Sequence, residues 1–211
     1  SSNTTLYAVW TANSLTVTYD SQGGSAISDG STTTGASIAS SPGTPTRSGY
    51  TFNGWFAASS GGSAISFAYA HGQTANFTLY AQWSAITYSV TYNGNTNGSG
   101  SVPTDATAYS SGATVTVAGN TGSLAKTGYT FGGWCTTQPA AGAACSGTSQ
   151  AAASTFAISS NTTLYAVWTA NSLTVTYDSQ GGSAISNGST TTGASIASSP
   201  GTPTQIGRAH V

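Results

Sequence analysis

Residues 49–56 read GYTFNGWF and residues 128–135 read GYTFGGWC, two nearly identical stretches in a chain that has few other large side chains. In the first stretch the aromatic side chains alternate as along a strand until Trp55, which is out of phase by one residue. A β-bulge at Asn53-Gly54 restores the phase, because glycine tolerates the backbone geometry that a bulge requires. The stretch therefore predicts a core strand whose bulge turns an indole inward.

The composition excludes several classes of partner. The 211 residues include only three Lys and Arg, and the formal net charge is −1. Nucleic acids and anionic membranes both require clustered basic side chains, so neither is an expected partner. No apolar run approaches the roughly 20 residues of a membrane span, so we expect no membrane insertion in this segment.

The aromatic content argues for an ordered β protein. About a third of the chain is Ser plus Thr, a composition that is typical of flexible linkers. However, five Trp, eleven Tyr and six Phe recur at fixed places. A disordered segment lacks such residues, because it does not bury enough apolar surface to offset the entropy of ordering.

These aromatic residues belong to an internal repeat, which is the main organisational signal of the sequence. The stretch LYAVW at 6–10 returns as LYAQW at 79–83 and as LYAVW at 164–168. The motif VTYD or VTYN recurs at the same intervals of 73 and 85 residues. Two independent markers therefore agree on the boundaries between repeats.

The boundaries predict two complete repeats, A and B, between two truncated ones. The predicted parts are the last strand of a truncated upstream repeat at 1–11, repeat A at 12–84, repeat B at 85–169 and the N-terminal half of another repeat A at 170–205. Residues 1–46 recur as 159–204 with one substitution, Asn187 in place of Asp29. Residues 206–211 follow no repeat and resemble a translated sequencing adaptor, so we interpret them as an artefact.

Alternation within each repeat predicts which side chains form the core. SLTVTYD at 14–20 alternates apolar and polar residues, as a half-buried strand does, and NFTLYAQW at 76–83 is apolar on both faces, as a covered strand is. A domain of this size buries only about 60 % of its unfolded surface, so a few large side chains must supply much of the core. The predicted structural core comprises Leu15, Val17, Tyr19, Tyr50, Phe52, Trp55, Leu79, Trp83, Val90, Tyr92, Tyr129, Phe131, Trp134, Leu164 and Trp168.

Taken in order, VTYDSQGG, a proline-containing connection, GYTFNGWF and TLYAQW resemble the Listeria–Bacteroides repeat, also called the internalin B repeat. The resemblance covers both complete repeats and both truncated ones. It implies a mainly β fold, α+β at most, built from tandem small β-grasp-like domains. It also implies an extracellular location, on a secreted or wall-attached protein of the bacterial cell surface, often an adhesin. The sequence departs from the family in having few Lys and no Glu.

The two cysteines, Cys135 and Cys145, lie in one loop rich in Ala, Gly and Thr. A local disulfide is geometrically feasible there and would staple the loop in an oxidising compartment. The alternative is a pair of inert thiols. The spacing is not that of a CxxC motif and no histidine lies nearby, which disfavours zinc binding and redox chemistry.

The titratable groups do not predict an active site. They are Asp20, Asp29, Asp105, Asp178 and His71, with no Glu. We interpret Asp20 and Asp29 as turn residues and His71 as a solvated loop residue rather than a ligand. A calcium site at Asp20 and Asp29 is a weaker alternative, because the usual alternation of oxygen ligands is missing. We therefore expect no catalysis, no metal and no cofactor.

The remaining hypotheses concern adhesion. Exposed Ser, Thr, Asn and Tyr can form hydrogen bonds with a host-surface protein or a polysaccharide, which favours an adhesin stalk or adhesive module that contacts its neighbouring repeats. A second hypothesis is self-association, because uncharged sheet edges lack the charges that prevent strand pairing between molecules. A third is that the repeats are passive spacers.

Overall fold

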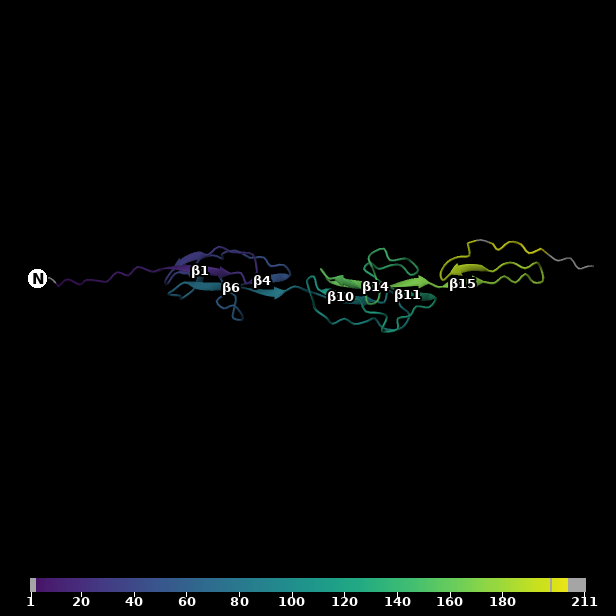
Figure 1. Cartoon of the computed structure of the whole chain (residues 1–211), viewed down its shortest axis with the longest axis horizontal. Coiled ribbons are helices and arrows are strands. Elements are labelled where there is room, and N and C mark those ends of the chain that lie inside the picture. The colour runs from purple at the N-terminus through teal and green to yellow at the C-terminus, as the bar shows by residue number, and fades with distance from the viewer. Residues whose placement is uncertain (1–2, 198, 205–211) are drawn as a thin grey trace, which may run out of the picture. The chain divides into compact units, whose positions relative to one another are not determined.

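The computed structural model describes residues 3–197 and 199–204, and the regular secondary structure of this part is β-strand (Figure 1). No helix occurs among these described residues. The mainly β expectation is confirmed. The chain divides into two compact units between Thr87 and Tyr88, three residues beyond the predicted boundary. The supposed artefact at 206–211 lies outside the described residues.

Strands of both units are short and are joined by irregular loops. The strands up to the boundary are β1 (Ser14–Asp20), β2 (Gly30–Thr33), β3 (Ser37–Ile38), β4 (Tyr50–Phe56), β5 (Tyr69–Ala70), β6 (Phe77–Ala85) and β7 (Thr87–Tyr88). Those that follow are β8 (Val90–Asn93), β9 (Tyr109–Ser110), β10 (Thr114–Thr116), β11 (Tyr129–Cys135), β12 (Ser149–Gln150), β13 (Thr155–Ala157), β14 (Thr162–Ala170), β15 (Ser172–Val175) and β16 (Gly188–Thr191).

In unit 1 the main sheet has the order β2-β1-β6-β4. Strands β1 and β6, the first and the closing strand of the repeat, pair in parallel, with Val17 opposite Phe77 and Tyr19 opposite Leu79. The two outer pairings are antiparallel. The closing LYAQW strand is thus central, which explains why a stretch near the end of the repeat must carry buried side chains.

In unit 2 the main sheet has the order β12-β11-β14-β8. Again the first and closing strands, β8 and β14, pair in parallel, and β11 pairs with β14 antiparallel. The sheet differs from that of unit 1 at both ends. Strand β8 has no hairpin partner corresponding to β2, and β12 adds a short strand beside β11.

The bulge predicted in GYTFNGWF is confirmed. Phe52 lies opposite Trp83 and the register then shifts before Gly54, which lies opposite Gln82. Gly54 has a φ of 122°, a backbone conformation that side chains with a Cβ atom rarely adopt. The same shift occurs in unit 2 at Gly133, where φ is 106°. The extra residue brings Trp55 back to the core side of the sheet.

Each unit has its own aromatic core. In unit 1 it consists of Val17, Tyr19, Trp55, Leu79 and Ala81, and Tyr19 and Trp55 meet edge to face with ring centroids 5.1 Å apart. In unit 2 it consists of Val90, Tyr92, Val115, Val117, Leu124, Trp134, Ile158, Leu164, Ala166 and Trp168. Both units thus bury the Trp of the bulged strand, whereas the second repeated Trp is fully buried only in unit 2, as Trp168.

Most of the predicted core residues lie in or against these cores. Leu15 is buried, and the partly buried members Phe52, Trp83, Tyr129 and Phe131 pack against the buried clusters. The expectation for Tyr50 is wrong, because this residue is 37 % exposed. It begins β4, and the Arg47 guanidinium lies 3.9 Å from the centroid of its ring, so the ring supports a cation at the surface instead of entering the core.

The half-repeat at the C-terminal end keeps only its hairpin. Strands β15 and β16 pair in the same register as β1 and β2. Leu173 is 48 % exposed, whereas its counterpart Leu15 is 5 % exposed. The sequence is identical, so the difference arises from the missing β4 and β6 counterparts.

The N-terminal stretch is not the strand that was predicted. Described residues 3–11 form no strand, and Leu6, Tyr7, Val9 and Trp10 are between 85 % and 92 % exposed. The same LYAVW sequence forms the centre of β14, where β8 and β11 flank it. A strand of this kind needs neighbours on both sides, and residues 3–11 have none in the described chain.

Candidate functional site

One face of the unit 1 sheet is mainly polar along β1 and β6. Leu15, Val17 and Tyr19 on β1 are buried, so the alternating residues Thr16, Thr18 and Asp20 point to the opposite face, where they are exposed. On β6, Thr78 and Tyr80 alternate with buried Leu79 and Ala81 in the same way and are partly exposed.

Cross-strand pairing brings four of these side chains together. In the parallel register of β1 and β6, Thr18 lies opposite Thr78 and Asp20 lies opposite Tyr80. Residues paired in this way stand side by side on one surface of a sheet. We call this set the threonine–tyrosine face of unit 1.

Unit 2 presents the same arrangement. Thr91 lies opposite Thr163, and Asn93 lies opposite Tyr165, across the parallel pair β8 and β14. Their exposure follows that of unit 1, with the β8 residues exposed and the β14 residues partly exposed. The one chemical difference is Asn93 in place of Asp20. These four residues form the threonine–tyrosine face of unit 2.

The hydroxyls of both faces are free to bind a ligand. Within the part of the chain that the structure describes, the side-chain hydroxyls of Thr18, Thr78 and Tyr80 make no hydrogen bond to protein, nor do their unit 2 counterparts. Tyrosines elsewhere are engaged: the Tyr92 hydroxyl accepts from the Ala118 amide at 2.8 Å, and Tyr109 donates to Asp105 at 2.8 Å. A hydroxyl both donates and accepts, so each free group offers two kinds of contact.

A fixed turn borders the face of unit 1. The Gln22 amide donates to Asp20 Oδ1 at 2.8 Å, which holds Gln22 at a φ of 46°. The Gln22 side-chain amide then donates to the carbonyls of Ser59 and Ala81 at 2.8 and 2.7 Å. A shallow depression of about 540 Å³ lies here, lined by Thr18, Asp20, Gln22, Thr78 and Tyr80 among others.

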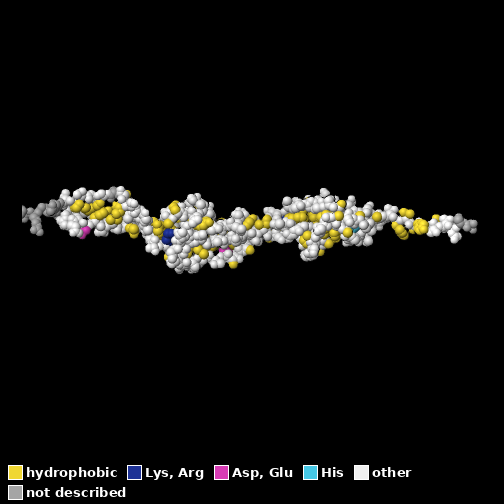
Figure 2. All heavy atoms as spheres, turned by 180° about the vertical axis from the view of Figure 1, so that it is seen from behind, with side chains coloured by type: hydrophobic (Ala, Val, Ile, Leu, Met, Phe, Trp, Pro, Cys, Tyr) yellow, Lys and Arg dark blue, Asp and Glu magenta, His cyan; other side chains and the backbone are white. Residues whose placement is uncertain are grey.

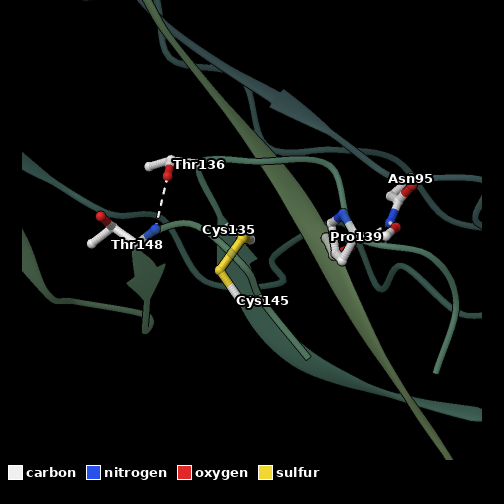
Figure 3. Close-up of a disulfide and its surroundings, with 7 residues drawn as sticks. Asn95, Cys135, Thr136, Pro139, Cys145 and Thr148 are labelled. Atoms are coloured by element: carbon white, nitrogen blue, oxygen red, sulfur yellow. Dashed lines mark hydrogen bonds between the residues drawn. A yellow bond between two sulfur atoms is a disulfide. The ribbon is translucent and has the colours of Figure 1, made fainter. Parts of the chain in front are cut away.

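The corresponding turn of unit 2 is built with asparagines. The Asn95 amide donates to Asn93 Oδ1 at 2.8 Å. Its side chain donates to the carbonyl of Pro139 at 2.8 Å, and both residues are labelled in Figure 3. The same side chain donates to the carbonyl of Ala166 at 2.9 Å. Asn95 is 5 % exposed, so these bonds are shielded from water. Asn95 has a shorter side chain than Gln22, and it still reaches both carbonyls because the carbonyl of Pro139 lies close to the turn in this unit.

A loop that follows the bulged strand forms the rim beside each tyrosine. Phe56 is the β4 partner of Tyr80, and Cys135 is the β11 partner of Tyr165. Cys135 is bonded to Cys145 (Figure 3), and their Cα atoms are 5.6 Å apart. The disulfide thus occupies in unit 2 the position that a phenylalanine side chain occupies in unit 1, and it ties the loop to the edge of the site.

Charged groups are sparse around both faces, and the visible surface in Figure 2 is mainly white. The two cations among the described residues already have partners. Arg47 donates to the Gln22 carbonyl at 3.2 Å while covering the Tyr50 ring, and Lys126 donates to the carbonyl of Thr96 at 2.9 Å. Among the described residues, neither face therefore has an unengaged cation to bind an anion.

The titratable residues are not assembled into a catalytic group. Asp20 caps its turn as expected. Asp105 is partly buried, which alone raises its pKa, but hydrogen bonds from the Thr107 amide and the Tyr109 hydroxyl outweigh burial, so the pKa of Asp105 is lowered. In residues 3–197 and 199–204 no group of three or more His, Cys or acidic side chains is placed to hold a metal ion. No helix of this region is long and apolar enough to cross a membrane.

The interpretation of His71 as a solvated residue is wrong. His71 is 5 % exposed and stacks on Phe77 with ring centroids 4.9 Å apart. Its Nδ1 accepts from the Gln73 amide at 3.0 Å, and its Nε2 lies 3.3 Å from the Thr32 hydroxyl. Both ring nitrogens have partners, so the imidazole closes the end of the unit 1 sheet and is not available as a ligand.

The repeated geometry agrees with a known family. The sequence pattern of the Listeria-Bacteroides repeat domain matches residues 16–82 and 88–167, which include most of the main sheet of each unit. The chain belongs to the Listeria-Bacteroides repeat family. The resemblance expected from the four motifs is therefore confirmed, and each matched Listeria-Bacteroides repeat ends within its unit.

Three relatives place these repeats in larger proteins. A protein of Evansella cellulosilytica named "Putative membrane protein" is 39 % identical over 168 residues, which cover 79 % of this chain and 24 % of that protein. A second protein of that organism, named "Putative Gly-rich membrane protein", is 35 % identical over 68 % of this chain and 17 % of its own length. Internalin H of Listeria monocytogenes is 42 % identical over 37 % of this chain and 14 % of its own length.

The chain thus spans less than a quarter of each of these relatives. No solved structure matches it. Listeria-Bacteroides repeats are typical of non-catalytic surface proteins, and the relatives agree with a repeat region of a surface or secreted protein.

Sequence reasoning found the cores of these repeats but did not single out the threonine–tyrosine face. A signal was present, because Thr and Tyr alternate with the core residues in both TVTY and TLYA. The pairing that brings Thr18 beside Thr78 joins segments 60 residues apart, and only the parallel register reveals it.

Proposed function

We propose that the chain is a non-catalytic adhesive module of a bacterial surface protein, in which each repeat offers its threonine–tyrosine face to a partner outside the cell. The observation that carries this proposal is the recurrence of the same polar face, with unengaged hydroxyls and at most one charged group, in two repeats of different sequence. A passive spacer has no need to place a tyrosine and two threonines identically in both units.

The lack of charge agrees with an adhesive role that does not depend on ionic attraction. Contacts made by hydroxyl, amide and aromatic groups are little affected by salt, whereas surface ion pairs weaken as salt screens them. Several weak sites in tandem strengthen one another, because the first contact raises the local concentration of the next. Repeats of this type are therefore suited to multivalent attachment.

The sheet order supports a β-grasp-like description of each repeat as part of the same proposal. In the order β2-β1-β6-β4 the first hairpin lies beside a closing strand that runs parallel to β1. An irregular connection containing β3 follows β2, where such a fold allows a helix.

The test is an adhesion assay with the whole chain. Beads coated with the chain are applied to surfaces of cultured animal cells and of immobilised polysaccharide, and their retention under flow is compared with that of albumin-coated beads. Retention that the soluble chain competes away supports the proposal. Retention equal to that of albumin on every surface favours the spacer hypothesis.

Self-association is a second candidate, because β4 forms a free edge of the unit 1 sheet and carries no charged residue. Two features oppose extended pairing at this edge. The bulge at Gly54 interrupts the ladder, and the Ile65 amide already donates to the Trp55 carbonyl at 2.8 Å. Sedimentation over a wide concentration range, in low and high salt, distinguishes the candidates, since homotypic adhesion requires reversible oligomers that persist in salt.

A further inference from the structure

We infer that the threonine–tyrosine face of each unit binds a neutral polysaccharide chain. This inference rests on the proposed adhesive function and adds to it the location of the contact and the chemical class of the ligand. The argument has three parts: the groups that the face offers, the charges that it lacks, and the rim that holds it in place.

The groups on the face match the groups of a sugar. A sugar ring has an apolar surface of C–H bonds and a periphery of hydroxyls that both donate and accept. The aromatic ring of Tyr80 can pack on the C–H surface of the sugar, and its phenol hydroxyl can bond to the sugar hydroxyls. Thr18 and Thr78 stand opposite each other and add two unengaged hydroxyls, while Asp20 retains a second carboxylate oxygen after Oδ1 has accepted from Gln22.

The comparison of the two units indicates that the ligand is neutral. Asp20 disfavours an anionic polymer in unit 1, and Arg47, the cation that borders this face in the described chain, is already engaged with the Gln22 carbonyl and the Tyr50 ring. Asn93 replaces Asp20 in unit 2, so a cationic polymer gains nothing there. Only a ligand recognised by hydrogen bonds and ring contact is accommodated equally by both faces.

The composition also disfavours a protein partner. The core of a protein interface is usually apolar and enriched in several aromatic residues, Met and Arg. The exposed part of each face has one tyrosine among hydroxyl, amide and carboxylate groups, since Phe56 beside Tyr80 is buried. A shallow depression in which hydroxyl, amide and carboxylate groups accompany Tyr19 and Tyr80 is a better match for a hydrated polymer than for an apolar protein surface.

The rim keeps the face in a fixed form before a ligand arrives. In unit 1 the Gln82 side chain donates to the carbonyls of Ala58 and Gly61 at 3.0 and 2.8 Å, which holds the loop after β4 beside Tyr80. In unit 2 the bond between Cys135 and Cys145 restrains the corresponding loop beside Tyr165. Binding to a fixed surface loses less conformational entropy than binding to a mobile one.

The experiment is affinity electrophoresis of the folded 211-residue chain through gels that contain a neutral polymer (dextran, mannan or galactomannan) or the anionic polygalacturonate. We expect at least one neutral polymer to retard the chain, and about 1 M salt to leave the retardation unchanged. The double variant Tyr80→Ala with Tyr165→Ala should bind at least about fivefold more weakly, with each single variant intermediate. Tyr50→Ala is the matched control, because Tyr50 is an exposed tyrosine outside both faces, and it should bind as the original chain does.

A second pair of variants guards against misfolding. Thr18→Val and Thr91→Val retain branched, strand-favouring side chains and replace only the hydroxyl with a methyl group, so they should weaken binding while the Trp fluorescence of the folded chain is unchanged. Three results would overturn the inference: no retardation by any neutral polymer, retardation by polygalacturonate alone, or full binding by the double tyrosine variant. If any one of these results is obtained while coated beads still adhere to cells, the assignment of the binding site is wrong and the proposed adhesive function stands. If bead adhesion is also absent, both fail.

Discussion

The Gln22 side-chain amide donates to the main-chain carbonyl of Ala81 at 2.7 Å and so joins the first turn of unit 1 to its closing strand. The two residues are 59 positions apart in the sequence. Asn95 makes the corresponding bond to Ala166 in unit 2, at 2.9 Å. In the half-repeat, Gln180 has no closing strand to reach, and its side chain donates to Asp178 instead.

This relationship predicts a position-dependent effect of one substitution. Gln22→Ala leaves the carbonyls of Ser59 and Ala81 without their donor and should destabilise unit 1 by about 1–3 kcal/mol. Gln180→Ala is the matched control, since it removes the same residue from the same local sequence without a long-range bond, and it should leave stability unchanged. Urea denaturation monitored by Trp fluorescence measures both, and equal effects would show that the Gln22 bonds contribute nothing.

The two tryptophan environments predict a second contrast. Trp55 is 1 % exposed and packs on Tyr19, so Trp55→Ala should cost unit 1 about 3–5 kcal/mol of unfolding free energy. Trp10 is 91 % exposed, and Trp10→Ala should have no effect on either unit. Calorimetry checks both variants. A single transition shifted as a whole by Trp55→Ala would contradict the division into independent cores.

The disulfide predicts a redox effect confined to unit 2. Reduction of the bond between Cys135 and Cys145 releases a loop with a sequence separation of 10, which should lower the stability of unit 2 by about 2–3 kcal/mol. Unit 1 contains no cysteine and serves as the internal control. Thermal unfolding with and without a reductant is the measurement, and a shift of the unit 1 transition would argue against the assignment.

The buried tyrosines predict a loss of stability in alkali. Burial raises the pKa of Tyr19 and of Tyr92 above the ordinary value of 10.0, so the folded state favours the neutral phenol. This contribution is fully present below pH 10 and declines as pH rises through the higher folded-state values. Urea titrations at pH 7, 9 and about 11 should therefore show stability falling only in the last step.

A tyrosine-to-phenylalanine change tests that assignment. Tyr19→Phe removes an ionisable phenol for which the structure gives no hydrogen-bonding partner among the described residues, so it should reduce the alkaline loss with little effect at neutral pH. Tyr92→Phe should also reduce the alkaline loss, but it removes the acceptor of the Ala118 amide and should cost about 1 kcal/mol at neutral pH. An unchanged alkaline loss in the double variant would contradict the prediction.

The sequence by itself determined the repeat units, the strand character of their motifs and the bulge that carries Trp55. These features follow from spacing and alternation within a few residues, which a strand imposes directly on its own sequence. The same local logic indicated that Cys135 and Cys145 were close enough to bond. The predicted burial of Tyr50 and the predicted exposure of His71 were wrong. The exposure of each side chain depends on a neighbour outside its own local pattern, Arg47 for Tyr50 and Phe77 for His71.

Only the tertiary structure decided which polar side chains share a surface. Identical sequences behave differently at Leu15 and Leu173, and LYAVW is an exposed stretch at 6–10 but a central strand at 164–168. The threonine–tyrosine face depends on the same kind of information, since Thr18 meets Thr78 only when β1 and β6 pair in parallel. A strand buries side chains and aligns hydroxyls through partners distant in sequence, and no local pattern specifies those partners.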